Sequence, residues 1–346
     1  MGKDLPFEAQ KGVYCFGGGK ALNTIDFCLR KMGLLDHILA VVDNDERKWG
    51  TEKRIYEKSV PVISPLALRN KIQDGIILIT CKDEKNVRAQ LSSYPELRST
   101  PIFSYREDVL GWLSKQAERL TFPKGLRSTS EQLIPPVIHY CWFGGAPIPD
   151  TFQRYIDGWH RLCPDYEIKR WDESNYDVTK NQYMQKAYEA KKWGFVPDYA
   201  RLDIIYEHGG IYLDTDVELV KCLDELRYNK AFCGVDYSCR VSSGLGFGAV
   251  AHHPAIQMLR DDYENQVFHD FSTRSEQQKH TKVAPELQSD ILMKKGLKRN
   301  CLLTQDICDM RIYSLPVLAG IIGPHKVVTP FTYALHHYAG TWVPKK

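Results

Sequence analysis

Two aspartates separated by one residue, Asp214 and Asp216, follow an apolar segment that opens with a glycine pair. The β-forming residues around them predict a strand, in which side chains at positions i and i+2 point to the same side. The two carboxylates are therefore expected to face one cation, and oxygen ligands suit Mg²⁺ or Mn²⁺ better than zinc. Such an ion keeps positions open for phosphate oxygens. The alternative is a solvated turn after a strand, because the motif is short.

A second pair of charged residues, Asp198 and Arg201, lies just upstream within residues 193–208, whose pattern predicts a helix. Pro197 near the first turn and Gly209 after the last residue mark the two ends of this helix. Residues three apart share a helix face. Asp198 and Arg201 therefore form either a local ion pair or a site in which a carboxylate binds hydroxyl groups beside a phosphate-binding guanidinium.

Four motifs occur in order along the second half of the chain. They are IHYCWFGG at 138–145, FVPDYAR at 195–201, GGIYLDTD at 209–216 and HHYAGTW at 336–342. Together they resemble the DXD-containing glycosyltransferases of the family 32 type, which include bacterial capsular polysaccharide sugar transferases and the fungal initiating mannosyltransferase. The resemblance covers residues 134–346, and it is specific because the motifs occur together. It implies an α/β fold with a GT-A-type catalytic domain that binds a nucleotide sugar.

The resemblance also implies roles for individual residues. Asp198 would bind sugar hydroxyls, Arg201 would bind the sugar and the diphosphate, and these two with Asp214 and Asp216 are the expected catalytic residues. The expected donor-binding residues are Trp142, Asp198, Arg201, Tyr212 at the sugar-phosphate region, Asp214 at the ribose, and Trp342 near the β-phosphate. In the related glucosylating bacterial toxins, a tryptophan at the position of Trp142 stacks on the nucleobase, whereas a core tryptophan is the alternative here.

A third metal ligand is implied by the closing motif of the family, which places it five residues before the tryptophan, at His337. The expected ligands are thus Asp214, Asp216 and His337, and an imidazole favours Mn²⁺ over Mg²⁺. The implied reaction transfers a hexose from a nucleotide diphosphate sugar, with a UDP-sugar favoured, to a glycan or lipid-linked glycan hydroxyl in polysaccharide or glycoconjugate synthesis. Retention follows from the resemblance. The alternative is a non-catalytic protein that binds a nucleotide sugar or a glycan.

Strands are predicted at 12–16, 38–42 and 75–80, with a helix at 21–32 and an apolar-periodic segment at 64–72. This alternation indicates a parallel, doubly wound sheet. Gly17 and Gly19 lie in a strand-to-helix turn and Asp43 ends the next strand, as in dinucleotide-binding proteins. Leu22, however, stands where the third glycine of that fingerprint would be. The segment resembles the small Rossmann-like modules appended to bacterial sugar-modifying enzymes. It is either such a ligand-binding module or a purely structural one, and an oxidoreductase role is disfavoured.

The 346 residues are enough for two domains, expected at 1–120 and 134–346 with a polar, turn-rich linker at 121–133. A formal net charge of +3 gives no reason to expect nucleic acid binding. The ten cysteines include no C-x-x-C pair, and no apolar run approaches the roughly 20 residues of a membrane span. We therefore expect a cytoplasmic protein with reduced cysteines. If its acceptor is lipid-linked, we expect the protein at the inner face of the membrane.

Alternating patterns continue after the linker. They predict strands at 137–142 and 166–171 and helices at 150–162, 182–192 and 286–295. A glycine-rich segment at 242–248 follows the acidic pair. Its backbone is expected either to approach a ligand closely or to form a bent strand.

Overall fold

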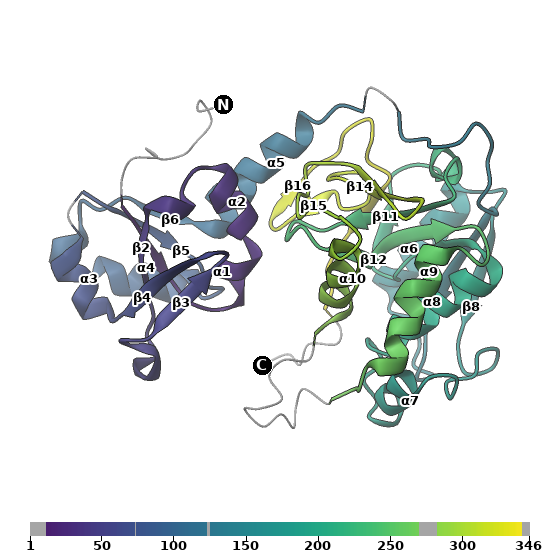
Figure 1. Ribbon diagram of the computed structural model, residues 1–346, viewed down its shortest axis with the longest axis horizontal. Coiled ribbons are helices and arrows are strands. Elements are labelled where there is room, and N and C mark those ends of the chain that lie inside the picture. The colour runs from purple at the N-terminus through teal and green to yellow at the C-terminus, as the bar shows by residue number, and fades with distance from the viewer. Residues whose placement is uncertain (1–11, 73, 123–124, 270–281, 341–346) are drawn as a thin grey trace. The chain divides into compact units, whose positions relative to one another are not determined.

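The computed structural model describes residues 12–72, 74–122, 125–269 and 282–340 (Figure 1). The chain divides into two compact units. The first unit comprises Met1–Arg119 with Tyr237–Cys239 and Ile322–Lys326, and the second unit comprises the remainder. The limits expected for two independently folding domains stay a prediction.

A six-stranded sheet organises the first unit, in the order β3-β4-β2-β1-β5-β6. Neighbouring strands pair in parallel except in the β3–β4 hairpin. The strands are β1 (Val13–Phe16), β2 (Ile38–Val42), β3 (Glu52–Ile55), β4 (Lys58–Ile63), β5 (Ile76–Ile79) and β6 (Ile102–Ser104). The inner strands are apolar and almost wholly buried, as expected for a parallel sheet covered on both faces. The predicted parallel sheet is thereby confirmed.

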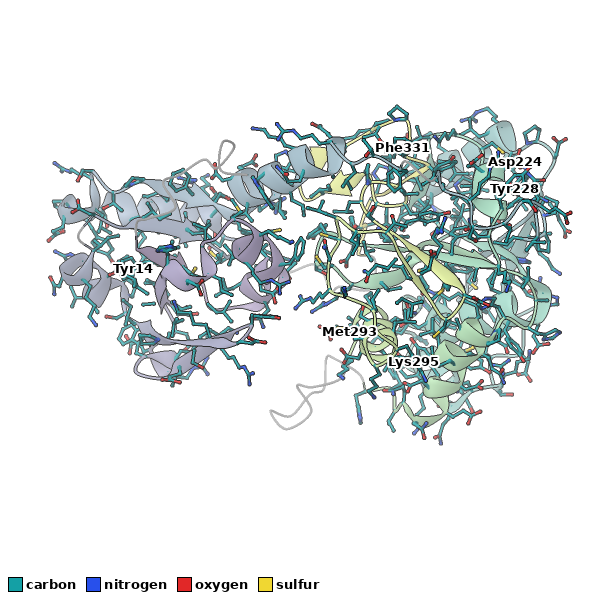
Figure 2. The ribbon with its side chains drawn as sticks, turned by 45° about the horizontal axis from the view of Figure 1, so that its top comes forward. Tyr14, Asp224, Tyr228, Met293, Lys295 and Phe331 are labelled. Atoms are coloured by element: carbon teal, nitrogen blue, oxygen red, sulfur yellow. The ribbon has the colours of Figure 1, made fainter. Side chains whose placement is uncertain are left out.

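Short helices connect the strands of the first unit. They are α1 (Lys20–Thr24), α2 (Asp26–Lys31), α3 (Pro65–Lys71), α4 (Glu84–Ser92) and α5 (Leu110–Glu118). The single helix predicted at 21–32 is two helices that meet at Ile25, whose side chain is fully buried. Leu22, which stands where the dinucleotide-binding fingerprint has its third glycine, is also fully buried and belongs to the core. The Tyr14 hydroxyl donates to Lys71 O at 3.1 Å and ties β1 to the end of α3 (Figure 2).

A seven-stranded mixed sheet organises the second unit, in the order β13-β14-β11-β12-β9-β7-β8. β8, β7 and β9 are parallel, whereas β12 runs antiparallel to both β9 and β11. The strands are β7 (Val137–Cys141), β8 (Glu167–Trp171), β9 (Gly210–Tyr212), β11 (Ala231–Val235), β12 (Val241–Ala249), β13 (Gln305–Ile307) and β14 (Met310–Tyr313). The second unit also contains the strand pair β10 (Val217–Leu219) with β17 (Ala334–His336). β15 (Ile321–Ile322) pairs with β16 (His325–Lys326), and Ile322–Lys326 belongs to the first unit.

Five helices accompany this sheet in the described residues: α6 (Asp150–Leu162), α7 (Gln182–Glu189), α8 (Pro197–His208), α9 (Pro254–Asp261) and α10 (Ala284–Met293). The predicted helix at 150–162 is confirmed, as are the strands at 137–142 and 166–171 to within one residue at an end. α8 begins at Pro197, four residues later than predicted, because proline fits the first turn of a helix. α8 packs against α9 and lies next to β7, β9 and β12 (Figure 1).

Part of the predicted linker is bound to the second unit, at the 3₁₀ helix η5 (Asp224–Arg227) and the residue after it. Ser128 N and Thr129 N donate to Tyr228 O at 2.9 and 3.0 Å. The Arg127 guanidinium lies 3.9 Å from the centroid of the Tyr228 ring. Figure 2 shows Tyr228 next to Asp224 at this place. Residues 127–129 of the linker expected at 121–133 therefore already belong to the folded second unit.

None of the ten cysteines forms a disulfide bond. Burial raises the pKa of Cys15 and of Cys141 to about 12, so both thiols stay protonated near neutral pH. In the described ranges no helix combines the length and the apolar character that crossing a membrane requires.

Candidate active site

The charged residues singled out in the sequence converge at one edge of the seven-stranded sheet. β7 and β9 are parallel neighbours, so Trp142 and Asp214, which follow their carboxyl ends, lie at the same edge. α8 runs back along the sheet, because only Gly209 separates its last residue from β9. The first turns of α8, which carry Asp198 and Arg201, are thereby brought to that edge. In open α/β sheets this edge is where ligands bind.

The reversal between α8 and β9 requires glycine at two positions. Gly209 and Gly210 have φ angles of +67° and +95°, a region that side chains disfavour. A Cβ on Gly210 would stand 2.8 Å from His139 Nε2. His139 donates from Nε2 to Gly209 O at 3.0 Å and accepts from Trp171 Nε1 at Nδ1, also at 3.0 Å. Burial lowers the pKa of His139 to about 4, so a neutral imidazole holds the start of β9 in place.

The segment that carries Asp214 and Asp216 is a turn, and the strand predicted there is wrong. β9 ends at Tyr212 and β10 begins at Val217. Val217 N donates to Asp214 O at 3.0 Å, which is the bond that closes a β-turn. The ladder between β9 and β12 stops at Tyr212, and Leu213 N makes one more bond to β7, to His139 O at 3.0 Å, so the sheet bonds reported for this segment end before Asp214. The two carboxylates still face the same place, because the turn brings them together.

Asp214, Asp216 and His336 bring three potential ligand atoms within 4.8 Å of one another, and within the described ranges this is the single group of that kind. His336 Nε2 lies 3.3 Å from Asp216 Oδ1 and 4.0 Å from Asp214 Oδ2. Asp216 Oδ2 accepts from Ala339 N at 2.8 Å, which orients the carboxylate. Burial acts to lower the pKa of His336, but its bond to Asp214 and the charges of both aspartates raise it. Two carboxylates and an imidazole fit Mn²⁺ or Mg²⁺.

The predicted third ligand, His337, donates from its backbone N to Asp216 O at 3.1 Å, but its imidazole contacts other residues. Its Nε2 is 2.9 Å from Glu218 Oε2, and its ring stacks on Tyr155 with the centroids 4.7 Å apart. The reason is the register of β10 and β17, which pairs Val217 with His336. Consecutive residues of an extended segment point to opposite sides, so only one of the two histidines can face the acidic turn. That histidine is His336, and the prediction for His337 is corrected accordingly.

Arg201 is a buried cation shared by two carboxylates. Its Nη2 donates to Asp198 Oδ1 at 3.1 Å, its Nη1 lies 3.4 Å from Asp214, and its Nε donates to Pro197 O at 3.0 Å. Burial raises the pKa of Asp198 to about 6, against the opposing charge of Arg201. Burial also acts to raise the pKa of Asp214, but Arg201 and His336 outweigh it and the pKa is lowered. The Asp198–Arg201 pair is thus a local ion pair that also contacts the acidic turn.

Gly244 of β12 lies directly against this group of charges. A Cβ on Gly244 would clash with Asp214 Oδ2 and would stand 3.2 Å from Arg201 Nη1. The neighbouring residue Ser243 is fixed by α10, because its N–H donates to Gln288 Oε1 at 3.1 Å and its Oγ accepts from Gln288 Nε2 at 2.8 Å. The glycine-rich segment therefore lets the backbone approach the side chains of the site.

The remaining donor-binding residues predicted from the sequence have different surroundings. Trp142 is half-buried, and its Nε1 donates to Ala146 O at 2.6 Å, which fixes the indole at the sheet edge. Tyr212 is fully buried, with its ring centroid 5.2 Å from the Arg201 guanidinium carbon. Trp342 lies outside the described residues.

Two residues at this site, His336 and Gly244, were not singled out in the sequence. A signal existed for each, since His336 adjoins His337 in the closing motif and Gly244 lies in the glycine-rich segment at 242–248. Neither could be selected from these signals alone, because strand register and close backbone approach depend on residues far away in the sequence.

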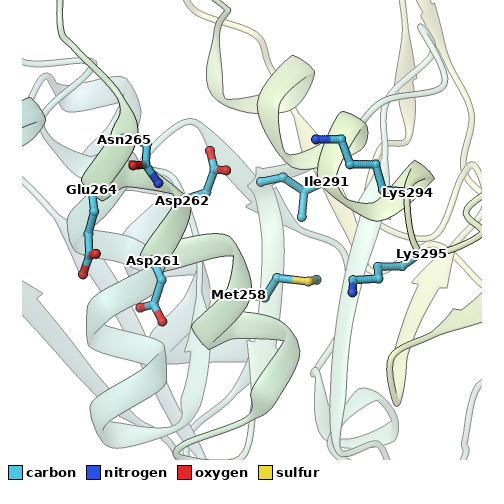
Figure 3. Close-up of a pocket in the computed structure, with 8 residues that line it drawn as sticks. All are labelled: Met258, Asp261, Asp262, Glu264, Asn265, Ile291, Lys294 and Lys295. Carbon is cyan, nitrogen blue, oxygen red and sulfur yellow. The ribbon is translucent and has the colours of Figure 1, made fainter.

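A separate groove of about 540 Å³ lies between the end of α10 and the segment formed by α9 and the 3₁₀ helix η6 (Asp262–Asn265). Figure 3 shows acidic side chains on one wall and lysines on the other. The lining residues are Met258, Asp261, Asp262, Glu264, Asn265, Ile291, Lys294 and Lys295. No residue of the Asp214, Asp216 and His336 group lines this groove.

Residues 149–233 match the family described as a glycosyltransferase sugar-binding region containing a DXD motif. Inositol phosphoceramide mannosyltransferase 3 of Schizosaccharomyces pombe is 30% identical over 142 residues, which are 39% of this chain and 38% of that protein. Mannosyl phosphorylinositol ceramide synthase SUR1 of Saccharomyces cerevisiae is 31% identical over 127 residues, which are 36% of this chain and 33% of that protein. The chain thus spans less than two-fifths of the length of these curated relatives.

Among solved structures, the PaToxG Glycosyltransferase aligns with a TM-score of 0.38 and 13% identity, over 55% of this chain and 79% of that chain. The sequence matches, independently of that alignment, show similarity to a DXD-containing glycosyltransferase sugar-binding region. The matched region contains Asp198, Arg201, Asp214 and Asp216.

Proposed function

We propose that the second unit is a metal-dependent glycosyltransferase domain of the GT-A type. It transfers a hexose from a nucleotide diphosphate sugar to a hydroxyl group of a glycan or lipid-linked glycan, with retention. The observation that carries the proposal is the convergence of Asp214, Asp216 and His336 beside the buried Arg201. The three potential ligand atoms and the neighbouring guanidinium thus form one charged group at the sheet edge where ligands of open α/β sheets bind.

In this mechanism Asp214, Asp216 and His336 hold a divalent cation, which when bound supplies positive charge for the leaving diphosphate. Arg201 is held in a fixed position by Pro197 O and two carboxylates, and stabilises the same developing charge. Asp198 binds a hydroxyl group of the hexose. Because Arg201 is already oriented before the donor binds, little reorganisation is needed in the transition state.

The half-buried indole of Trp142, oriented by its bond to Ala146 O, is proposed to stack on the nucleobase. Mn²⁺ is the proposed ion, because an imidazole joins the two carboxylates. The relatives reported above are named for inositol phosphoceramide, so a sugar alcohol on a lipid is the first acceptor class to test, at a cytoplasmic membrane face. The first unit is proposed as a Rossmann-like accessory module.

The proposal is tested with the full chain and a panel of UDP- and GDP-linked hexoses, mannose included, in the presence of Mn²⁺. Hydrolysis of each donor without acceptor is measured, and the assay is repeated with EDTA. We expect metal-dependent release of the nucleoside diphosphate from at least one donor. If no donor is bound or hydrolysed at millimolar concentration, the proposal fails. Binding without turnover would favour the non-catalytic alternative.

A further inference from the structure

Tyr263 has a buried hydroxyl group without a hydrogen-bond partner in the part of the chain that the structure describes. Its side chain is 2% exposed. Tyr263 lies in η6, where its neighbours Asp262 and Glu264 line the groove of Figure 3, whereas Tyr263 itself is buried among aromatic rings. Buried polar groups are nearly always hydrogen-bonded, because leaving one unpaired costs free energy. The unpaired hydroxyl therefore requires an explanation.

The position of Tyr263 is set by α7 and its cap. The Tyr263 ring packs edge-on against Tyr183, with the ring centroids 5.2 Å apart. Asn181 caps α7 by accepting from Tyr183 N at 2.9 Å, and its Nδ2 donates to Tyr263 O at 3.3 Å. One side chain thus anchors both tyrosines. The Tyr183 hydroxyl, in turn, donates to Asp198 Oδ2 at 3.4 Å, which places this aromatic pair next to the proposed sugar-binding carboxylate.

The charges of the proposed donor site act on the Tyr263 hydroxyl. Burial is the main cause of its raised pKa, Asp198 raises the pKa further, and Arg201 lowers it. Asp198 and Arg201 are themselves 6% and 5% exposed, so Tyr263 is about as buried as the two residues proposed to bind the donor. Asp198 Oδ2 has only the long bond to Tyr183 in the described structure, so a ligand hydroxyl would complete the bonding of Asp198 and Tyr263 together.

We infer that the Tyr263 hydroxyl is a specificity-determining contact to a hydroxyl group of the donor hexose, acting beside Asp198. The inference rests on the proposed transfer function. A phenolic hydroxyl both donates and accepts, so it can bind a sugar hydroxyl whose other bond goes to the Asp198 carboxylate. A site built in this way rejects a sugar that lacks the matching hydroxyl, because its own polar groups are then left unpaired.

Tyr263→Phe tests the inference in the full chain, because it removes the hydroxyl and keeps the ring. The measurements are KM for the donor that the wild type hydrolyses, the activity on donors that lack one hexose hydroxyl at a time, and Tm. We expect KM to rise about tenfold. The wild-type penalty against one particular deoxy donor should disappear. Tm should stay unchanged or rise, because an unpaired polar group has been removed.

Tyr313→Phe is the matched control. Tyr313 is also fully buried in the second unit, but its hydroxyl donates to Leu126 O at 2.6 Å. The control should lower Tm and leave KM and the deoxy-donor pattern unchanged. If Tyr263→Phe lowers Tm as the control does, or leaves KM and the deoxy-donor pattern at wild-type values, the inference is overturned. A wild type that binds no nucleotide sugar would remove the proposed function itself, which is a separate and distinguishable failure.

Discussion

Both units place glycines and aspartates at the carboxyl edge of parallel strands, yet the aspartates of the two edges differ in what surrounds them. In the first unit, Asp43 follows β2 and accepts from Gly18 N at 3.1 Å, from Asp45 N at 3.0 Å and from Lys48 Nζ at 2.9 Å. Burial acts to raise the pKa of Asp43, but these bonds outweigh it and the pKa is lowered. This carboxylate is stabilised by its own loop and by the segment that follows β1.

In the second unit, the acidic pair Asp214 and Asp216 is crowded against a histidine, with a shared arginine as the main compensating charge. The difference shows why similar sequence patterns need not form similar sites. At the first edge, two backbone N–H groups and a lysine already supply the hydrogen-bond partners that a ligand would otherwise provide. At the second edge, carboxylates from one short turn meet side chains from distant strands and helices, and their remaining lone pairs are available to a cation.

The largest effect is expected when one aspartate at each edge is replaced by asparagine, which removes its negative charge. Asp216→Asn should lower the transfer rate roughly a hundredfold or more with an unchanged Tm, because several kcal/mol of metal-assisted stabilisation are lost and each 1.36 kcal/mol is about tenfold. Excess Mn²⁺ should restore little activity. Asp43→Asn is the control in the first unit and should leave the rate unchanged. Near-normal turnover of chelator-treated Asp216→Asn would show that the acidic pair is only a surface turn.

Acid should also distinguish the two edges. The pKa of His139 falls from 6.5 to about 4 on folding because of burial, so the unfolded chain takes up the proton first. The stability that neutral His139 contributes is complete above pH 6.5 and is lost as the pH falls to 4, by about 3 kcal/mol. The pKa of Asp43 is lowered from its ordinary value of 3.8 by its hydrogen bonds, so the stability that it contributes is lost mainly below this range. Urea unfolding at pH 7 and pH 4 measures the loss.

His139→Gln keeps a donor and an acceptor at this position but removes the titrating group. Its unfolding free energy should therefore fall less between pH 7 and pH 4 than that of the wild type. Equal losses in the two proteins would assign the acid sensitivity to other groups.

A smaller effect is expected from adding a single methyl group at each edge. Gly244→Ala places a Cβ against Asp214 and Arg201 and is expected to displace one of these charged groups. We therefore expect kcat/KM to fall about tenfold. Gly19→Ala is the matched control, because a Cβ on Gly19 would meet no atom within 4 Å and its φ of −79° suits any residue. If Gly244→Ala kept the wild-type kcat/KM, the side chains of Asp214 and Arg201 would have moved aside without loss of activity.

The smallest expected effect distinguishes the two adjacent histidines. His336→Ala should raise the Mn²⁺ concentration needed for half-maximal activity about fivefold to tenfold, since the acidic pair still binds the ion. His337→Ala should change it less than about twofold, because that ring contacts Glu218 and Tyr155. A metal titration of both variants measures this difference. The reverse order would reinstate the assignment made from the closing motif.

Much of the fold could be predicted from the sequence, because its signals are local. The helix at 150–162 and the strands beginning at 137 and 38 follow from side-chain periodicity within each segment. The prediction of one helix at 21–32 was less accurate. No proline or glycine marks the break at Ile25, which occurs where the Ile25 side chain is buried in the core. The strand predicted through the acidic segment was wrong for a related reason, since the β-forming residues leave the extended state where pairing with β12 stops, although β12 itself continues.

The sequence by itself determined which charged residues the second unit has available: Asp198 and Arg201 on one helix face, and Asp214 and Asp216 two positions apart. These relations depend only on the geometry of neighbouring residues. Three features depend on the tertiary structure: His336 and not His337 faces the acidic turn, Gly244 lies against Asp214, and the Tyr263 hydroxyl has no hydrogen-bond partner among the described residues. Each of these depends on strand register or on packing between segments far apart in the chain, where a shift of one residue exchanges the side chains that meet.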